Sequence, residues 1–447
     1  MIDWYSVNID SINIDTVCAM TDRTPEARQL TTKEVARFLG VKPETVYAYV
    51  SRGQLTSRRG HGGRGSTFDA AEVEALAHRT RREAATAAAG DTVGRVRTGI
   101  TLIEGDRYYY RGVDATELAA RFTYEEVAEW LWTGALNPGI RFTAPPAALE
   151  SARRVVAALP EHSAMPELLR AAAVAAAAAD PLRFDLSPTT VLGTARGLIP
   201  TLVDALPPVG ATHSGDDAGQ RLAWRLWSRL TPSIPDGDGV RALDSALVLL
   251  MDHDLAASTL AARVAASSRA HPYAVVSAGL GATDGPLHGA ASGLAHRMLA
   301  EVLDRGSAGA VVADHLRAGR RVPGLGHRIY QGQDPRAEAL FGILERIPGA
   351  RPALEAARAV ERTTAAHVPV HANIDLAVAA LTVSSGMASA AGETMFAVAR
   401  TVGWIAHALE EYEERPSRMR PNGEYTGARP PMPLPSPSSP PPGVREV

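Results

Sequence analysis

Hydrophobic residues recur at helical spacing along most of the chain. From residue 95 to residue 427, Leu, Ala and Val recur at three- and four-residue intervals, with Pro and Gly between the periodic segments. Runs typical of strands are few, and the clearest are Gly99 to Glu104 and Tyr108 to Arg111. The pattern therefore predicts a mainly α-helical body with a small amount of strand near its start.

A shorter unit at residues 30–82 precedes this body. Thr31 and Glu34 have the spacing of a helix-opening capping box. The helix that follows is expected to present one apolar face, made of Val35, Ala36, Phe38 and Leu39. Gly40 would end this helix, and Pro43 suits the first position of a second one. Two helices joined by a tight turn with glycine are typical of a helix-turn-helix, whose second helix enters the major groove of DNA.

An arginine- and glycine-rich stretch, residues 58–65, comes next, and a further helix is expected from Asp69. This order resembles the winged helix-turn-helix of the MerR and excisionase families, with the arginine–glycine stretch as the wing. Residues 30–82 hold ten Lys or Arg against five Asp or Glu, a local charge of +5 that suits phosphate contacts. The expected DNA contacts are Lys42, Thr45, Tyr49, Arg52, Arg58, Arg59 and Arg64. The alternative is a small helical appendage that contacts other proteins.

The composition of the whole chain is globular. Its 447 residues are 45% hydrophobic and 21% charged, which suits about two to four domains or subdomains. The net charge of −3 excludes a polybasic nucleic-acid coat. The single cysteine, Cys18, excludes an intrachain disulfide framework and a Cys-rich zinc site. With no apolar run near the ~18 residues of a membrane span and no signal-peptide pattern, the sequence predicts a soluble cytoplasmic protein.

Both ends of the chain differ from this composition. Residues 1–29 are polar and lack periodicity, so we predict a disordered N-terminus. Eight of the eighteen residues from Pro430 to Val447 are proline, and we predict a disordered tail over residues 428–447.

Four stretches in the second half combine His, Asp, Gly and Pro in an unusual way. They are Asp252 to Thr259, Gly285 to Ser292, Pro323 to Tyr330 with Asp334 to Arg336, and Asn373 to Asp375. His288 lies in a Gly/Pro turn before a helix, whose dipole would keep the ring neutral and able to donate to a carbonyl oxygen. Asp375 precedes an apolar segment and is a candidate base with a partly desolvated carboxylate. Taken singly, each is also explained as an ordinary turn residue.

Arginines give independent evidence for an anionic ligand. The segment 395–406 is apolar or small apart from Arg400 and Thr401, and a buried guanidinium should meet an anion. Arg336 and Arg420 lie in similarly defined Asp-Pro-Arg and Arg-Pro settings. Arginines that converge with histidines and one aspartate predict a substrate with two or more carboxylates. The alternative is internal ion pairing, for example with Glu393 or Glu410.

Together these segments resemble the signature segments of citrate synthase in order and separation. They are Gly-Pro-Leu-His-Gly at 285–289, Gly-Leu-Gly-His-Arg-Ile-Tyr at 324–330, Asp-Pro-Arg at 334–336 and Asn-Ile-Asp at 373–375. The likeness covers roughly residues 95–427. It implies a mainly α citrate-synthase fold after the winged helix-turn-helix. The large domain would comprise residues 95–285 and 384–427, and a small domain, residues 286–383, would close over the substrate.

The resemblance also implies a role for each matching residue. Asp375 would take a proton from the methyl group of acetyl-CoA, and His288 would donate a hydrogen bond to the thioester oxygen. His327 would polarise and protonate the oxaloacetate carbonyl. The oxaloacetate carboxylates would be bound by His253, Arg336, Arg400 and, from the neighbouring subunit of a homodimer, Arg420. No metal or other cofactor is implied.

The expected activity is that of a citrate synthase, an acyltransferase that condenses acetyl-CoA with oxaloacetate and water to give citrate and CoA. One alternative is 2-methylcitrate synthase, which uses propionyl-CoA, because the sequence does not fix the acyl pocket. Another is a catalytically weak, metabolite-sensing transcription regulator, motivated by the basic unit at 30–82. Gln331 points the same way, since it stands where a Lys or Arg often lies near the coenzyme A phosphates. A dimer would bring two helix-turn-helix units together, as a palindromic operator requires.

Overall fold

The computed structural model describes residues 29–39, 41, 43–51, 55–59, 66–73, 76, 96–209, 219–285, 291–421, 424–427 and 429. Backbone contacts divide the chain into two compact units. One contains residues 1–95 with 421–447, and the other contains residues 96–420. The ends for which we predict disorder lie almost wholly outside the described residues.

In its described residues the N-terminal unit contains helices α1 and α2, a short helical stretch at residues 70–73, and a three-stranded antiparallel sheet. Its elements are β1 (Gln29–Thr31), α1 (Thr32–Leu39), α2 (Pro43–Ser51), β2 (Arg58–Arg59) and β3 (Ser66–Asp69), with strand order β1-β3-β2. The predicted capping box is confirmed: the Thr31 N–H donates to Glu34 Oε2 at 2.8 Å, and the Glu34 N–H donates to Thr31 Oγ1 at 3.4 Å. The buried core consists of Val35, Ala36, Val46, Leu55, Phe68, Val73 and Leu76.

Phe38 does not join this core, contrary to the sequence prediction. Its side chain is 51% exposed. Val35, Ala36 and Leu39 fall within about 100° of one another around the helix axis, whereas Phe38 lies beyond the edge of that arc. The three other apolar residues are therefore enough to pack α1 against the core, and Phe38 faces solvent.

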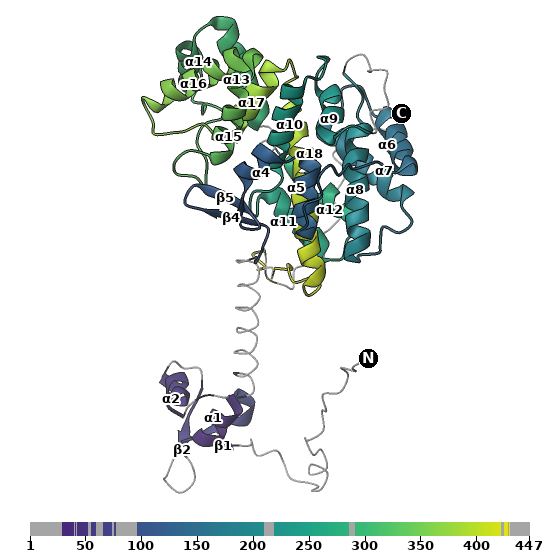
Figure 1. The fold of residues 1–447 in the computed structure, drawn as a ribbon. Coiled ribbons are helices and arrows are strands. Elements are labelled where there is room, and N and C mark those ends of the chain that lie inside the picture. The colour runs from purple at the N-terminus through teal and green to yellow at the C-terminus, as the bar shows by residue number, and fades with distance from the viewer. Residues whose placement is uncertain are drawn as a thin grey trace, which may run out of the picture. The chain divides into compact units, whose positions relative to one another are not determined.

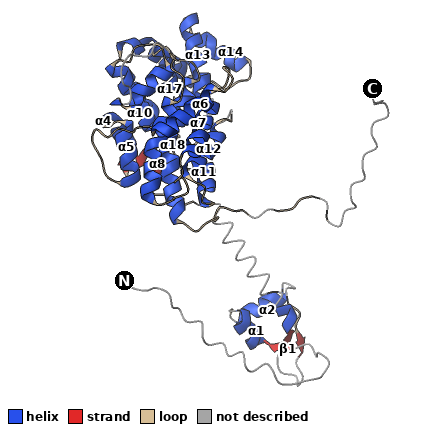
Figure 2. Ribbon diagram, turned by 90° about the vertical axis from the view of Figure 1, so that its right-hand side faces the viewer, coloured by secondary structure: helices blue, strands red, loops and turns tan. Residues whose placement is uncertain are grey.

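The larger unit is almost entirely helical (Figure 2). Its strands are β4 (Thr101–Glu104), β5 (Arg107–Tyr110) and β6 (Val113–Asp114), paired antiparallel in that order. β4 and β5 confirm the two predicted strands. The helices are α4 (Ala115–Arg121), α5 (Tyr124–Thr133), α6 (Pro146–Ala157), α7 (Met165–Ala179), α8 (Pro188–Asp204), α9 (Leu222–Leu230), α10 (Gly237–Leu250), α11 (Ala257–Ser267), α12 (Pro272–Thr283), α13 (Ala291–Arg305), α14 (Ala308–Arg317), α15 (Pro335–Leu344), the 3-10 turn η2 (Pro348–Ala350), α16 (Arg351–Ala365), α17 (Ile374–Ser384) and α18 (Ala391–Glu413).

Helix α18 is the centre of this unit. It is 23 residues long and is buried on nearly every face, as expected of a helix that is apolar all round. It packs against α8, α10, α11 and α12 (Figure 1). At Gly403 it passes so close to the segment after α10 that a Cβ would clash with the carbonyl of Met251.

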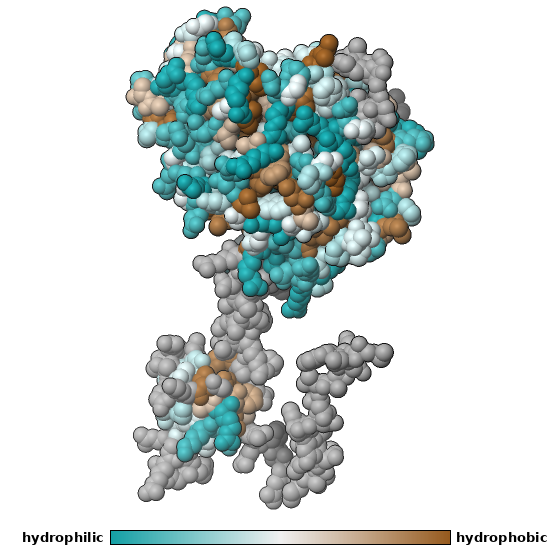
Figure 3. Space-filling model, in the orientation of Figure 1, coloured by the Kyte–Doolittle hydropathy of each residue, from teal (hydrophilic) through white to brown (hydrophobic). Residues whose placement is uncertain are grey.

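Helices α13 to α17 form a second group, drawn in green in Figure 1. The apolar helix α17 packs against α13, α15 and α16. The visible face of this group is largely hydrophilic (Figure 3). In the part of the chain that is described, no helix is long and apolar enough to cross a bilayer.

Candidate active site

A cavity of about 560 Å³ lies between the α13–α17 group and the ends and faces of α10 and α18. Its lining brings together five residues predicted from the sequence: His253, His327, Arg336, Asp375 and Arg400. They come from separate elements: the turn after α10, the loop before α15, and helices α15, α17 and α18. The fold therefore collects cationic, imidazole and carboxylate groups from a span of roughly 150 residues in one place.

His253 lies in the turn between α10 and α11, which strand β5 holds in place. The Asp252 N–H donates to the Tyr110 hydroxyl at 3.1 Å, and that hydroxyl lies 2.9 Å from the carbonyl of Val248. His253 Nε2 is 2.8 Å from the Tyr330 hydroxyl. Burial, reinforced by two nearby arginine charges, lowers the pKa of His253 well below its usual range. The ring is therefore neutral at pH 7 and can share a hydrogen bond with a polar ligand.

A short antiparallel clip ties the loop at 324–330 to the start of α17. Leu325 forms a β-bridge with Ala372, and the Asn373 N–H donates to the carbonyl of Gly324 at 3.0 Å. Gly324 has a φ of +77°, and a Cβ there would lie 2.7 Å from a side-chain atom of α17, so glycine is required. We call this feature the Leu325–Ala372 clip.

His327 follows the clip directly. Its Nδ1 accepts hydrogen bonds from the backbone N–H groups of Ile329 at 3.0 Å and Tyr330 at 3.4 Å. The proton of a neutral ring must therefore reside on Nε2. Nη2 of Arg336 lies 3.3 Å from Nε2, and because a guanidinium only donates, this contact is not a hydrogen bond while Nε2 carries the proton. Burial and the charge of Arg336 lower the pKa of His327. His327 is thus a neutral donor beside a guanidinium, an arrangement suited to an electron-rich oxygen.

Arg336 is oriented by Asp334, the N-cap of α15. Its Nε donates to Asp334 Oδ1 at 3.0 Å and its Nη2 to Oδ2 at 2.8 Å. Oδ2 also accepts the N–H of Ile374 at 3.0 Å, so one carboxylate joins α15 to α17. Burial alone would raise the pKa of Asp334, but Arg336 outweighs it and holds that pKa low. Among the described residues Nη1 of Arg336 has no hydrogen-bond partner, which leaves it for a ligand.

Asp375 lies in the first turn of α17. Its backbone N–H donates to the side-chain oxygen of the helix cap Asn373 at 3.0 Å. Its side chain lines the cavity and is partly exposed there. Removal from bulk water raises the pKa of Asp375 to about 6, against the opposing charge of Arg336. A carboxylate with this pKa is ionised at pH 7 yet more basic than usual, as a general base should be.

Arg400 lies on the buried face of α18. Its Nε donates to the carbonyl of Leu250 at 2.8 Å, and its guanidinium stacks on Phe396 at 4.5 Å. Within the described part of the chain no carboxylate forms an ion pair with it. Of the two glutamates that the sequence left open as partners, Glu410 pairs with Arg263 at 2.6 Å, and Glu393 forms no ion pair with Arg400 among the described residues. Burial lowers the pKa of Arg400. An anionic ligand would therefore offset the desolvation cost of this buried, unpaired charge.

The two remaining predicted residues of this site are placed differently. His288 lies outside the described residues. Arg420 follows α18, is exposed, and does not line the cavity of its own chain. Gln331 is exposed as well, and its N–H donates to Asp106 Oδ1, at the tip of the β4–β5 hairpin, at 3.1 Å.

In the N-terminal unit, Arg58 is exposed on β2, whereas Thr45 and Tyr49 are half-buried on α2. Tyr49 packs against the small core, and its neighbour Tyr47 is 55% exposed. The expected DNA contacts Lys42, Arg52 and Arg64, and the side chain of Arg59, lie outside the described residues.

Sequence reasoning assigned no role to Tyr330, Asp334 or Asn373, although each holds a cavity residue in place. Tyr330 contacts His253, Asp334 orients Arg336, and Asn373 caps the helix of Asp375. All three lie inside the motifs quoted from the sequence. Their closeness along the chain to the site residues could have indicated that they support the site. Among the described residues no group of three or more His, Cys, Asp or Glu is placed to hold a metal ion.

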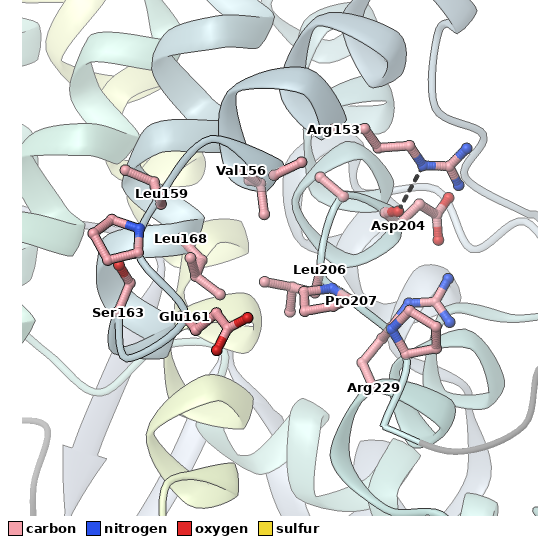
Figure 4. A pocket seen from close by; sticks show the side chains of 14 residues that line it. Arg153, Val156, Leu159, Glu161, Ser163, Leu168, Asp204, Leu206, Pro207 and Arg229 are labelled. Atoms are coloured by element: carbon pink, nitrogen blue, oxygen red, sulfur yellow. Dashed lines mark hydrogen bonds between the residues drawn. The ribbon is translucent and has the colours of Figure 1, made fainter.

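A second cavity, of about 520 Å³, lies beside α6, α8 and α9. Figure 4 shows apolar side chains such as Leu206 and Pro207 at its centre, with Arg153 bonded to the carbonyl of Asp204 at 3.1 Å. Neither a histidine nor any predicted site residue is among the described residues that line it. The first cavity is therefore the candidate active site.

Family models match both units of the chain. The model described as citrate synthase, C-terminal domain, matches residues 91–422, and the model described as helix-turn-helix domain matches residues 30–81. Citrate synthase of Haloferax volcanii is 31% identical over 352 residues, which cover 74% of this chain and 93% of that protein. The 2-methylcitrate synthase of Mycobacterium tuberculosis is 27% identical over 336 residues, covering 71% and 84%.

Solved structures show the same fold. Citrate synthase from Thermotoga maritima superposes with a TM-score of 0.60 at 26% identity, covering 76% of this chain and 95% of that one. The Thermoplasma acidophilum citrate synthase, solved with carboxymethyl coenzyme A and oxaloacetate, gives a TM-score of 0.63 at 24% identity, covering 76% and 96%. These matches confirm the predicted fold class, a helical synthase body preceded by a helix-turn-helix.

Proposed function

The chain belongs to the citrate synthase family, and on this premise we propose that the residues of the candidate active-site cavity condense an acyl-CoA with oxaloacetate. The observation that carries the proposal is the convergence of His253, His327, Arg336, Asp375 and Arg400 on that one cavity. A dicarboxylate with a ketone needs cationic groups for its carboxylates and a donor for its carbonyl, and the lining contains both. The carbon nucleophile needs a base, and Asp375 is the one described carboxylate that lines this cavity with its pKa raised to about 6.

In the proposed reaction Asp375 takes a proton from the methyl or methylene carbon next to the thioester. His288 donates a hydrogen bond to the thioester oxygen and so stabilises the enol. The enol carbon attacks the ketone of oxaloacetate while Nε2–H of His327 protonates the developing alkoxide. Hydrolysis of the resulting citryl thioester releases CoA and makes the overall reaction irreversible.

Oxaloacetate carboxylates are bound by the free edges of Arg336 and Arg400, with His253 as a neutral donor. Arg420 is exposed in its own chain, and we propose that it completes the site of the partner subunit in a homodimer. Residues 286–383 act as the small domain that closes over oxaloacetate and excludes water before condensation. No cofactor takes part beyond the acyl-CoA substrate.

Acetyl-CoA is the proposed thioester and citrate the product. Propionyl-CoA, which would give 2-methylcitrate, is the second candidate, favoured by the relationship to the mycobacterial 2-methylcitrate synthase. A thiol-release assay with oxaloacetate and each thioester decides between them through the ratio of kcat/KM values. Absence of thiol release with both thioesters, alongside retained oxaloacetate binding, would overturn the enzyme proposal in favour of a metabolite sensor.

We further propose that residues 30–82 bind DNA, on the strength of their +5 charge and the helix-turn-helix match. Binding is expected to weaken steeply with salt, because phosphate contacts release counterions. The double variant R58A/R59A should lower affinity and make the salt dependence shallower. Unchanged affinity in that variant would contradict the assignment of this stretch as a DNA-contacting wing. The cytoplasm, where a single-cysteine protein needs no disulfide, is the proposed location.

A further inference from the structure

A buried polar network runs through the helical body beside the active-site cavity. Its centre is Arg263 on α11, whose side chain is fully buried. Nε of Arg263 donates to Glu411 at 2.6 Å, and Nη1 lies 2.6 Å from both Glu410 and His407 Nδ1. One guanidinium therefore fastens α11 to three residues in the last turns of α18.

One end of the network reaches the turn that carries His253. Because Arg263 can only donate, His407 Nδ1 accepts, and the ring proton is on Nε2. Nε2 lies 3.3 Å from Asp252, the residue before His253, and Asp252 also accepts from Thr101 on β4 at 2.6 Å. The position of the His253 turn thus depends on His407 and, through it, on Arg263.

The other end reaches the segment that carries Arg420. Glu411, fully buried, also accepts from Arg418 Nε at 2.9 Å. The following turn is tied back to α11, since the Ser417 N–H donates to the carbonyl of Ser267 at 2.7 Å. Arg418 is therefore fixed two residues before Arg420, the residue proposed to enter the site of the partner subunit.

We propose that Arg263 is a positioning residue that sets two oxaloacetate-binding groups at once, His253 of its own site and Arg420 of the partner's site. The inference rests on the proposed function for its substrate and for the partner role of Arg420. Arg263 touches no cavity atom itself, and it acts through Asp252 and His407 at one end and through Glu411 and Arg418 at the other. A point charge cannot replace it, because lysine lacks the planar fork that serves three acceptors.

The test compares R263K with R225K, a matched control. Arg225 is equally buried and pairs with Asp204 at 2.7 Å, but neither its carboxylate partner nor its carbonyl partner Phe142 lines the active-site cavity. R263K should raise KM for oxaloacetate roughly tenfold and leave KM for the thioester within about twofold. R225K should lower stability without moving either KM. R418K loosens only the end of the network near Arg420 and should raise KM for oxaloacetate severalfold. It still tests the proposal if R263K does not fold.

Amide hydrogen exchange gives a second readout that needs no substrate. In the full-length protein, R263K should speed exchange at Asp252 and Ser417 relative to R225K, because both ends of the network lose their anchor. If thiol release is absent from the unmodified chain, the proposed function fails while this exchange test still decides the role of Arg263. The inference is overturned if R263K and R225K behave alike in oxaloacetate KM and in exchange at both ends, or if R263K raises both KM values equally.

Discussion

Asp375 is the residue on which the proposed chemistry depends most. D375N keeps the size of the side chain and the backbone N–H that the Asn373 cap accepts, but it removes the base. We expect kcat to fall by about 10²–10⁴-fold, the usual contribution of a general base. Thiol release measures the loss, and circular dichroism checks that the helical fold is kept. A rate close to that of the unmodified chain would contradict the assignment.

The raised pKa of Asp375 predicts a pH dependence with a definite sign. A base must be deprotonated, so the active form dominates above the pKa of about 6 and is lost below it. We expect kcat/KM for the thioester to be flat near neutrality and to fall about tenfold per pH unit well below 6. A profile that stays level down to about pH 5 would show that another group sets the acid limb.

At this scale the sequence predicted which residues meet but not how they are held. Five predicted residues line one cavity, because their motifs restrict the turns and helix starts on which they lie. The bidentate Asp334–Arg336 pair and the Tyr330–His253 contact were not foreseen. Both depend on side-chain directions and, for the second, on two segments far apart in the chain, which a linear pattern does not contain.

Among the elements, α18 approaches the His253 turn through a single small residue. A Cβ at Gly403 would clash with the carbonyl of Met251 and lie 2.8 Å from Asp252 Oδ1. We expect G403A to cost about 1–3 kcal/mol of unfolding free energy, as overpacking does, and to raise KM for oxaloacetate. Chemical denaturation and steady-state kinetics measure the two effects.

G193A is the matched control for that prediction. Gly193 lies in α8, and a Cβ added there would meet open space. Alanine there should stabilise the helix by about 0.5–1 kcal/mol and leave the kinetics unchanged. Equal destabilisation by G193A and G403A would mean that the close approach of α18 is not the cause.

Helix α5 carries a buried acid that the chemistry does not use. Glu125 accepts the N–H groups of Phe142 at 3.2 Å and Leu222 at 3.0 Å, and burial raises its pKa from 4.5 to about 7. An acid with a higher pKa in the folded than in the unfolded chain favours folding at low pH. This contribution is fully present below about pH 4.5 and is lost as pH rises through about 7.

The expected loss is about 3 kcal/mol of unfolding free energy between those limits. In E125Q this part of the pH dependence should vanish, although the amide gives up one of the two backbone bonds. Urea denaturation of both proteins across that pH range measures the difference. Parallel stability curves for the two would contradict the raised pKa.

At the scale of the whole molecule, the shared site predicts complementation between two inactive variants. R420A lacks the arginine offered to the partner, and D375N lacks its own base. In a mixed dimer the R420A subunit keeps Asp375 and receives Arg420 from the D375N subunit, so one of its two sites is complete. Random reassociation should restore about a quarter of the unmodified activity. No recovery, with dimers formed, would place Arg420 outside the partner's site.

The sequence predicted the overall architecture because helical periodicity and turn chemistry persist over hundreds of residues. The two strand runs also emerged, whereas β6, only two residues long, is too short to leave a pattern. Phe38 was misplaced because an apolar residue at the edge of a helical arc is compatible with either environment. The division at 286 and 383 into large and small domains stays a prediction.

The Leu325–Ala372 clip has a consequence for how such a protein can diversify. It holds the proposed acid and the proposed base on one pair of joined segments, because His327 is two residues after Leu325 and Asp375 is three residues after Ala372. The wall formed by Leu250 and Leu255 belongs to other elements. Redesign of that wall for a different 2-oxo acid need not disturb the spacing of the proton-transfer pair. Because of the clip, substitutions that change which substrate is bound can arise without altering the residues that transfer protons.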